Sequence, residues 1–172
     1  MKCFYCFLLL SVLCGQLRAQ SSHPFTLHVG ADLQFVSRGF GGNEAGFGPV
    51  AEAAFRTHKK WQLHAEGAAA WYWGNKVFYT GVPSQNVLAL SLKGGPRFYP
   101  LPRLSLSASA GLYLVKVRSS DFHPEDGYQF TLGYLAGPRR QVHFRGSYAI
   151  LPHPFGNMRY FGLGMTALIL RN

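Results

Sequence analysis

Residues 104–114 read LSLSASAGLYL, a run in which every second residue is Leu or Ala and the residues between are Ser, Gly or Tyr. Successive side chains of a β-strand point to opposite faces of a sheet, so this period of two predicts a strand with one apolar and one polar face. Ordinary globular strands cluster near 5–6 residues, whereas a tilted strand needs about 9–11 residues to cross a bilayer. The stretch therefore indicates a membrane-spanning β-strand.

Seven further stretches alternate in the same way, and they begin near Leu27, Phe47, Trp61, Leu88, Tyr128, Val142 and Phe161. Between the strands we expect connections near residues 37–45, 57–60, 74–84, 100–103, 119–127, 138–141 and 151–157, in which long and short alternate. Up-and-down membrane barrels have short turns on one side and longer loops on the other. The sequence predicts an all-β fold, an eight-stranded antiparallel up-and-down transmembrane β-barrel with short periplasmic turns and longer extracellular loops.

The first 19 residues have the features of a cleaved secretory signal peptide. Lys2 precedes an apolar run at 4–13, and residues 17–19 (Leu-Arg-Ala) form a plausible cleavage site. The run is shorter than the roughly 20 apolar residues of a membrane helix. Lipidation at Cys14 is disfavoured because Leu13, rather than a small residue, precedes it. We expect residues 20–172 to form the barrel domain, without cysteine and so without disulfides or thiolate metal sites.

The composition is basic and unusually poor in charge. The formal net charge of +10 falls to +8 once Lys2 and Arg18 leave with the signal. Charged residues make up 14% of the chain and aromatic residues 15%, whereas soluble domains carry about 25% charged residues. An exported protein meets little nucleic acid, so we expect no nucleic-acid partner. Anionic lipid head groups are the expected partners of the positive charge.

Alternation alone does not distinguish a membrane barrel from a soluble lipocalin-like one, which has its apolar face inside. The polar face here is mostly Ser, Gly, Thr and Gln, which suits the narrow interior of eight strands. The apolar face is bulky, and its aromatic residues gather near strand ends as membrane girdles do. The predicted aromatic girdle comprises Phe35, Phe47, Phe55, Trp61, Trp71, Trp73, Phe98, Tyr128, Phe144 and Tyr148. The membrane barrel is favoured, with a soluble periplasmic ligand-binding barrel as the alternative.

Over its whole mature length the chain resembles the small outer-membrane barrels of the OmpA/OmpX type. The resemblance lies in the signal, the eight alternating strands and the loop asymmetry, not in a short motif. The chain departs from the pattern at its end, where Leu170-Arg171-Asn172 replaces the usual aromatic residue. The resemblance implies a monomeric integral protein of the bacterial outer membrane, in contact with its lipid and lipopolysaccharide.

An inward polar face would place ten ionisable side chains in the lumen: His28, Asp32, Glu52, Arg56, His64, Glu66, Lys93, Arg97, His143 and Arg145. Buried charges must be paired or hydrated. Three acids facing four permanent cations predict a nearly neutral network that fills the lumen. We therefore expect a packed scaffold and no solute channel.

Some small outer-membrane barrels are lipid-modifying hydrolases, which makes an enzyme of the outer leaflet the second alternative. His143, Ser147 and Glu66 supply the residue types of a triad. His143 and Ser147 lie four residues apart on one face, roughly 13 Å along a strand, which is too far for a hydrogen bond. His153 has no partner serine in its loop. We predict no catalytic residue, no cofactor and no metal site.

The outer loops are the remaining candidates for function. Loop 74–84 is unusually apolar, and loop 119–127 is acidic and rich in turn residues. Loop 74–84 could contact an extracellular or envelope partner, or it could continue its two strands above the membrane. Loop 119–127 could contact such a partner or be a plain solvated loop. Basic residues expected at the outer rim, where lipopolysaccharide phosphates lie, are Arg38, Lys76, Lys116, Arg118 and Arg159. The sequence predicts a non-enzymatic barrel with a structural, envelope or surface-contact role through its extracellular loops.

Overall fold

The structure is a computed structural model that describes residues 25–38, 43–74, 87–117, 122–137, 141–151 and 158–171. The predicted signal peptide, residues 1–19, lies outside the described residues. No helix in the described part of the chain is long and apolar enough to cross a membrane.

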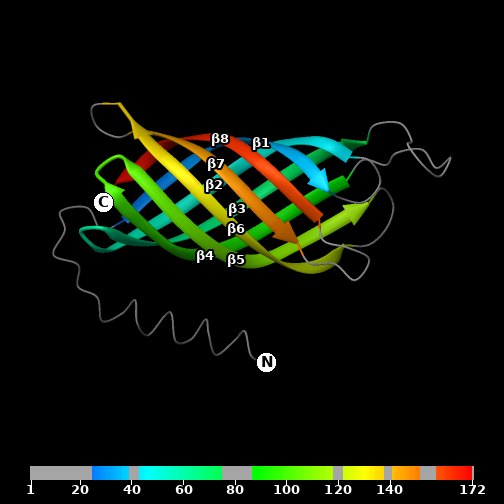
Figure 1. Cartoon of the computed structure of the whole chain (residues 1–172), viewed down its shortest axis with the longest axis horizontal. Helices are drawn as coiled ribbons and strands as arrows, with labels where there is room; N and C mark the ends of the chain where they lie inside the picture. The colour runs from blue at the N-terminus through cyan, green and yellow to red at the C-terminus, as the bar shows by residue number, and fades with distance from the viewer. Residues whose placement is uncertain are drawn as a thin grey trace, which may run out of the picture.

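Eight β-strands form one closed barrel, with each strand antiparallel to the next along the chain (Figure 1). The strands are β1 (Phe25–Arg38), β2 (Asn43–His58), β3 (Trp61–Gly74), β4 (Val87–Leu101), β5 (Leu104–Val117), β6 (His123–Ala136), β7 (Val142–Leu151) and β8 (Met158–Arg171). Pairing between β1 and β8 closes the sheet and leaves no free edge. The predicted all-β, eight-stranded, antiparallel up-and-down barrel is confirmed.

The strands are strongly staggered around the barrel. Starting at Leu27 on β1 and stepping from each residue to its partner on the next strand, one full circuit of the barrel ends at Arg38. Arg38 is eleven positions further along β1, and the pairing of β1 with β8 has a register shift after Val36. Stagger of this kind tilts the strands against the barrel axis and fixes the diameter. Eight strands leave an interior just wide enough for side chains.

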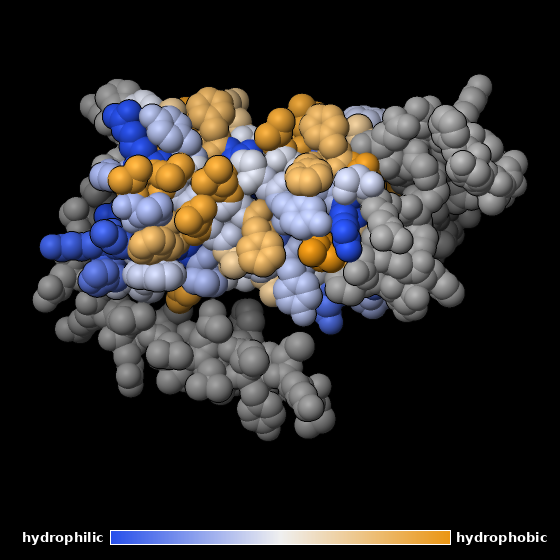
Figure 2. All heavy atoms as spheres, viewed as in Figure 1, coloured by the Kyte–Doolittle hydropathy of each residue, from blue (hydrophilic) through white to orange (hydrophobic). Residues whose placement is uncertain are grey.

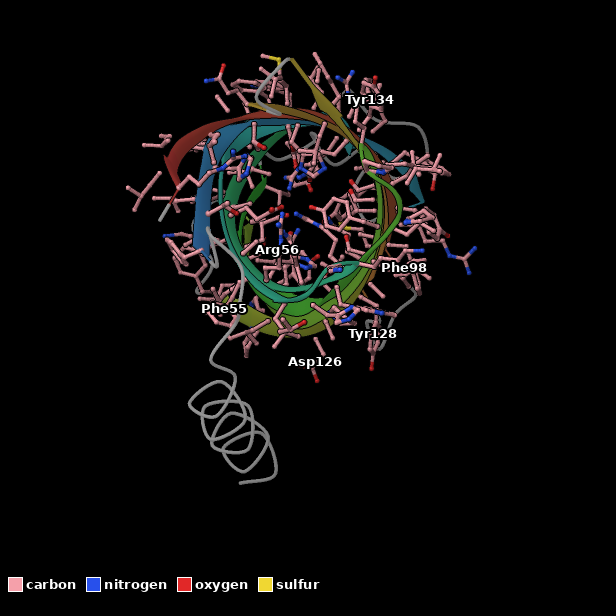
Figure 3. The ribbon with its side chains drawn as sticks, turned by 90° about the vertical axis from the view of Figure 1, so that its left-hand side faces the viewer. Phe55, Arg56, Phe98, Asp126, Tyr128 and Tyr134 are labelled. Carbon is pink, nitrogen blue, oxygen red and sulfur yellow. The ribbon has the colours of Figure 1, made fainter. Side chains whose placement is uncertain are left out.

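The two faces of the sheet have opposite chemistry. On β5 Ser105 is 2% exposed while its neighbour Leu106 is 47% exposed. Leu92 is 67% exposed, so the outer face carries large apolar side chains that a soluble barrel would hold inside. Viewed down the barrel, Arg56 lies on the inner side of the wall, whereas Phe55 and Tyr134 lie outside it (Figure 3). This arrangement fits a hydrocarbon surrounding and not a soluble lipocalin-like barrel.

The connections differ from the prediction, because the strands extend further than expected. Residues 123–127, expected within loop 119–127, belong to β6 and continue its ladder with β5 up to the pair Val115–His123. Similarly, the ends of the expected loop 37–45 belong to β1 and β2. The connection 118–122 is therefore no longer than the turn 137–141, and the predicted alternation of long and short is wrong at this point. Backbone hydrogen bonds continue as long as two neighbouring strands run side by side, whatever the polarity of their side chains.

The turn between β6 and β7 begins at Gly137, whose φ is 82°. Residues other than glycine adopt this left-handed conformation at a cost, because the Cβ atom crowds the backbone. Gly137 therefore lets the chain begin its reversal after β6. It lies at the end of the barrel where β2, β4, β6 and β8 end, which we call the short-turn end (Figure 1).

Candidate functional site

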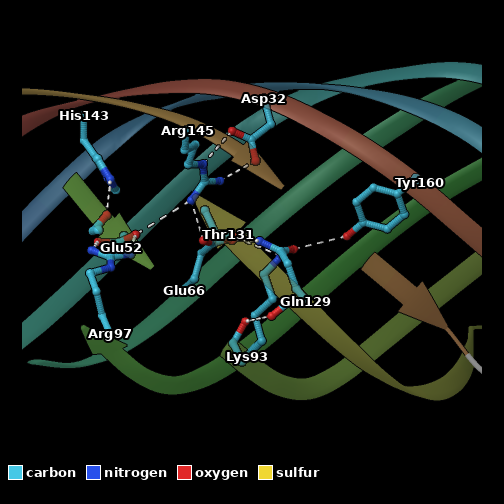
Figure 4. A network of polar contacts seen from close by, with 12 residues as sticks. Asp32, Glu52, Glu66, Lys93, Arg97, Gln129, Thr131, His143, Arg145 and Tyr160 are labelled. Atoms are coloured by element: carbon cyan, nitrogen blue, oxygen red, sulfur yellow. Dashed lines mark hydrogen bonds and ion pairs between the residues drawn. The ribbon is translucent and has the colours of Figure 1, made fainter. Parts of the chain in front are cut away.

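The middle of the lumen holds Arg145 from β7, which contacts acids from three other strands (Figure 4). Its Nε donates to Asp32 Oδ1 at 2.9 Å, and Nη2 donates to Asp32 Oδ2. Its Nη1 donates to Glu66 Oε2 and lies 3.8 Å from Glu52 Oε2. A guanidinium presents its donors in a rigid planar fork, which suits it to bind two or more carboxylates at once. Arg145 thus links β1, β2 and β3 to β7 across the lumen.

Two further cations complete this cluster. Arg97 donates to both carboxylate oxygens of Glu52, at 2.5 and 2.6 Å. Lys93 Nζ lies 2.9 Å from Glu66 Oε1 and donates to Gln129 Oε1 at 2.5 Å. We call the six ionic residues the polar network: Asp32, Glu52, Glu66, Lys93, Arg97 and Arg145.

The polar network is balanced, with three acids against three permanent cations, and all six residues are buried. Buried ions lose several kcal/mol of hydration each, so such a network is stable only when every charge is compensated. Arg56, the fourth cation expected here, faces inward but is only half-buried, near the β2–β3 turn. It lies outside the five ion pairs found among the described residues.

Three buried histidines lie beside the network, toward the short-turn end. His143 Nε2 is 3.3 Å from Ser105 Oγ. The rings of His28 and His143 meet edge-on, with centroids 6.2 Å apart. The Nδ1 atoms of His28 and His64 have no hydrogen-bond partner within the described residues. Nowhere in those residues do three potential His, Asp, Glu or Cys ligands converge as a metal site would require.

A layer of tyrosines, which was not predicted from the sequence, fills the lumen toward the loop end. Tyr72 donates to Gln34, and the hydroxyls of Tyr113 and Tyr160 are 3.2 Å apart. Tyr160 also donates to Gln129 Oε1 at 3.4 Å, which connects the tyrosines to Lys93 of the polar network. The cavity that these side chains line has a volume of only ≈ 20 Å³, room for about one water. The sequence feature that could have predicted this layer is the presence of large aromatic residues on a polar face that otherwise carries small side chains.

The triad considered from the sequence does not form. His143 meets Ser105 rather than Ser147, and Glu66 is engaged by Lys93 and Arg145. Ser105 and His143 are 2% and 1% exposed, so a substrate has no access to the pair as it stands. His153 lies outside the described residues. This part of the lumen is a packed interior, in contrast to the open cleft that a hydrolase presents.

Solved outer-membrane proteins share this architecture. Ail, the attachment invasion locus protein of Yersinia pestis, is 13% identical, with a TM-score of 0.61 over 87% of this chain and 100% of that one. Neisserial surface protein A (NspA) is 16% identical, with a TM-score of 0.63 over 84% of this chain and 96% of that one. The N-terminal β-barrel domain of Pseudomonas aeruginosa OprF is 14% identical, with a TM-score of 0.56 over 86% and 100%. The chain has the fold of the small outer-membrane barrels.

No protein-family model matches the chain, and no curated protein matches it. At the identities above, the likeness is one of fold. Outer-membrane barrels of this fold have their short turns in the periplasm. We accordingly call the short-turn end, where β2, β4, β6 and β8 end, the periplasmic end, and the tyrosine layer lies toward the opposite end.

All ten residues of the predicted aromatic girdle lie on the outer face of the sheet. Near the periplasmic end Trp61 packs against Phe98, with centroids 4.8 Å apart. Toward the loops Tyr148 packs against Phe161, with centroids 5.0 Å apart. The prediction omitted Phe161 and also Tyr134, which is paired with Phe144. Phe55, Phe98 and Tyr148 are half-buried, and the other seven are exposed.

The structure describes only part of the predicted outer rim. Lys116 lies near the loop end of β5, with its ammonium 5.4 Å from the ring centroid of Phe122. Arg159 is the second residue of β8, and its carbonyl accepts a hydrogen bond from Ser37. Arg38 ends β1. Lys76 and Arg118 lie outside the described residues, as does most of the apolar loop 74–84.

Exposed basic residues also occur at the periplasmic end, where no site was predicted from the sequence. Lys59 and Lys60 form the β2–β3 turn, and Arg103 lies in the β4–β5 turn. The sequence does contain a pattern that could have predicted these residues, because each short turn carries at least one Lys or Arg.

Proposed function

We propose that the protein is a non-enzymatic integral protein of the bacterial outer membrane, whose packed barrel holds its outer loops for contacts with lipopolysaccharide and with extracellular or envelope partners. The carrying observation is the combination of a lumen closed by the polar network and the tyrosine layer with an apolar outer face. A monomer suffices, because one chain closes the barrel by itself. The proposal includes a signal peptide at residues 1–19 for export and needs no cofactor.

The filled lumen supports a scaffold rather than a pore. Side chains of β1, β2, β3, β4 and β7 meet in the polar network, and the adjoining cavity of ≈ 20 Å³ is too small for a hydrated ion to pass. We expect the purified, folded barrel to show no stable conductance in a planar bilayer. The control is the same protein unfolded in urea before addition, which reports detergent leaks. Discrete, long-lived conductance steps from the folded monomer alone would contradict the packed-scaffold role.

The outer-rim cations support a contact with anionic sugars and phosphates. Ail, which is similar in fold, has been solved in complex with the heparin analogue sucrose octasulfate, and this supports the proposal. In this chain Lys116 and Arg159 come from β5 and β8, and the connections 75–86 and 118–122 join β3 to β4 and β5 to β6 at the same end of the barrel. These positive charges can bind the phosphates of lipopolysaccharide. Each Lys or Arg near an anionic surface contributes about 1 kcal/mol to the binding free energy.

We expect the double change Lys116→Gln and Arg159→Gln to weaken lipopolysaccharide binding by roughly fivefold or more, in line with the loss of about 1 kcal/mol or more. Binding is measured by the retention of fluorescent lipopolysaccharide on the detergent-solubilised barrel, at low and at high salt. The matched control is Lys60→Gln with Arg103→Gln, which removes the same charge from the opposite end. Equal weakening by both double variants would show that net charge, rather than the outer rim, binds the lipid.

A further inference from the structure

The periplasmic end of the barrel carries positive charge with no acidic residue near it in the sequence. We define the basic turn cluster as Lys59, Lys60 and Arg103, all of which are exposed. No Asp or Glu occurs in residues 53–65, 94–120 or 127–172. Of the seven acids of the chain, Asp32, Glu52 and Glu66 lie in the lumen, Glu44 lies near the start of β2, and Glu125 and Asp126 lie near the start of β6, at the loop end. The seventh, Asp121, lies outside the described residues. The charged side chains that the structure describes at this end are therefore all basic, and they can match an anionic partner.

An apolar groove of ≈ 710 Å³ starts beside this cluster on the outer face. Trp61 and Phe98 form its near end, and Tyr148 and Phe161 form its far end on β7 and β8. It crosses β5 and β6 between these aromatic pairs, and small outward residues such as Ala108 and Gly146 keep it open. Its volume lies within the 300–1,000 Å³ typical of ligand sites.

The cluster and the groove are close enough for one molecule to occupy both. Lys60 directly precedes Trp61, and its carbonyl accepts a 2.8 Å hydrogen bond from the amide of Tyr99, which holds the turn against β4. Arg103 lies three residues before Leu106, a groove residue, or about 10 Å along the strand. Hydrophilic residues gather at this left-hand end of the molecule, beside the apolar surface that follows it (Figure 2). An anionic head joined to an acyl chain fits that order.

We propose that the periplasmic end is a binding site for one anionic phospholipid of the adjacent leaflet. Lys60 and Arg103, with Lys59 beside them, bind the phosphate of its head group, and one acyl chain lies in the groove between Trp61 and Phe161. A lipid explains the pairing of charge and groove, which a free phosphate ion would not. The inference rests on the proposed membrane location, which determines that the short-turn end faces a phospholipid leaflet.

Trp61 reports occupancy of the site, because it lies at the near end of the groove. Trp71→Phe with Trp73→Phe leaves it as the only tryptophan of the mature chain. This variant is folded into phosphatidylcholine vesicles that contain a minor fraction of brominated phosphatidylglycerol or of brominated phosphatidylcholine, whose bromines quench nearby tryptophan. We expect brominated phosphatidylglycerol to associate about fivefold more strongly, the equivalent of about 1 kcal/mol from a basic residue near an anionic lipid.

Two variants test the two halves of the site in that background. Lys60→Gln with Arg103→Gln is expected to bring the preference for phosphatidylglycerol close to one, whereas Lys116→Gln with Arg159→Gln at the opposite end leaves it unchanged.

Gly146→Leu fills the groove without striking the backbone, since an added Cβ would meet only Leu163 Cδ2 at 3.9 Å, and it is expected to lower quenching by both lipids. Gly67→Leu is its matched control, an outward position on β3 with equally open space and outside the groove.

Equal association of the two brominated lipids with the inserted barrel, or a preference that survives Lys60→Gln with Arg103→Gln, overturns the inference and leaves the proposed function intact. A barrel that inserts into neither kind of vesicle contradicts the membrane location, and the inference falls with it. The pattern expected above supports both.

Discussion

Replacing Arg145 with methionine is expected to destabilise the barrel by roughly 3–5 kcal/mol, the range for removing one partner from a buried ionic cluster. Arg145 is 4% exposed and contacts Asp32 and Glu66 directly. Without it, three buried carboxylates face only Lys93 and Arg97. Methionine retains much of the length of the arginine side chain, so the loss reports charge and hydrogen bonds more than volume. The free energy of unfolding is measured by urea titration in lipid vesicles, followed by tryptophan fluorescence.

The double variant Asp32→Asn with Arg145→Met separates charge imbalance from the loss of the residue itself. It restores equal numbers of acids and cations in the lumen, so its destabilisation should be smaller than the sum of the two single changes by about 0.5–3 kcal/mol. Gln141→Met, an exposed position just before β7, controls for the introduction of methionine. Strict additivity of the two single changes would mean that Asp32 and Arg145 do not act as a pair.

Which residues face the lumen was predictable from the sequence, because the period of a strand is two. Ser105 points inward and Leu106 outward whatever their neighbours are, provided that one face is apolar and the other is not. The same rule places Asp32, Glu66 and Arg145 inside. Strand identity and side-chain direction are local properties, and a sequence read a few residues at a time contains them.

Which inward residues meet was not predictable, because contacts depend on the stagger of the whole barrel. Arg145 and Asp32 are 113 positions apart, and they meet only because β7, β8 and β1 pair in one register. The contact of Tyr113 with Tyr160 depends on the same closure. A stagger changed by two residues would keep every side chain on its face and give each a different partner. His143 was thus considered with Ser147, but the register brings Ser105 to it from β5.

The strand ends were the other weak point of the prediction. Pro124, Asp126 and Gly127 have the composition of a turn, yet they lie in β6 opposite residues of β5. Composition describes what a residue tolerates, whereas pairing depends on whether the neighbouring strand is still present. In a barrel whose strands continue beyond the bilayer, polar residues can remain in the ladder, so polarity there does not mark its end.

Replacing Leu92 with arginine is expected to destabilise the inserted barrel by about 2–4 kcal/mol, the cost of a basic residue on the lipid face near the bilayer midplane. Leu92 lies within β4, is 67% exposed and is paired with Leu112 and Gly67. In a soluble barrel an exposed leucine can be replaced by arginine at little cost, usually within ±0.5 kcal/mol. The effect of this one change therefore separates hydrocarbon from water as the medium outside the barrel.

Leu101→Arg is the matched control, since Leu101 ends β4 at the periplasmic end and is 60% exposed. Near the interface the same substitution costs about 0–1 kcal/mol, because the charged group reaches the head groups. Both variants are unfolded in urea from vesicles of the same lipid, and the difference between them is the result of interest. A Leu92→Arg barrel as stable as the Leu101→Arg barrel would mean that β4 does not cross hydrocarbon at Leu92. The apolar face, the girdle and the lipid site would then need an explanation outside a membrane, because all three depend on this strand spanning it.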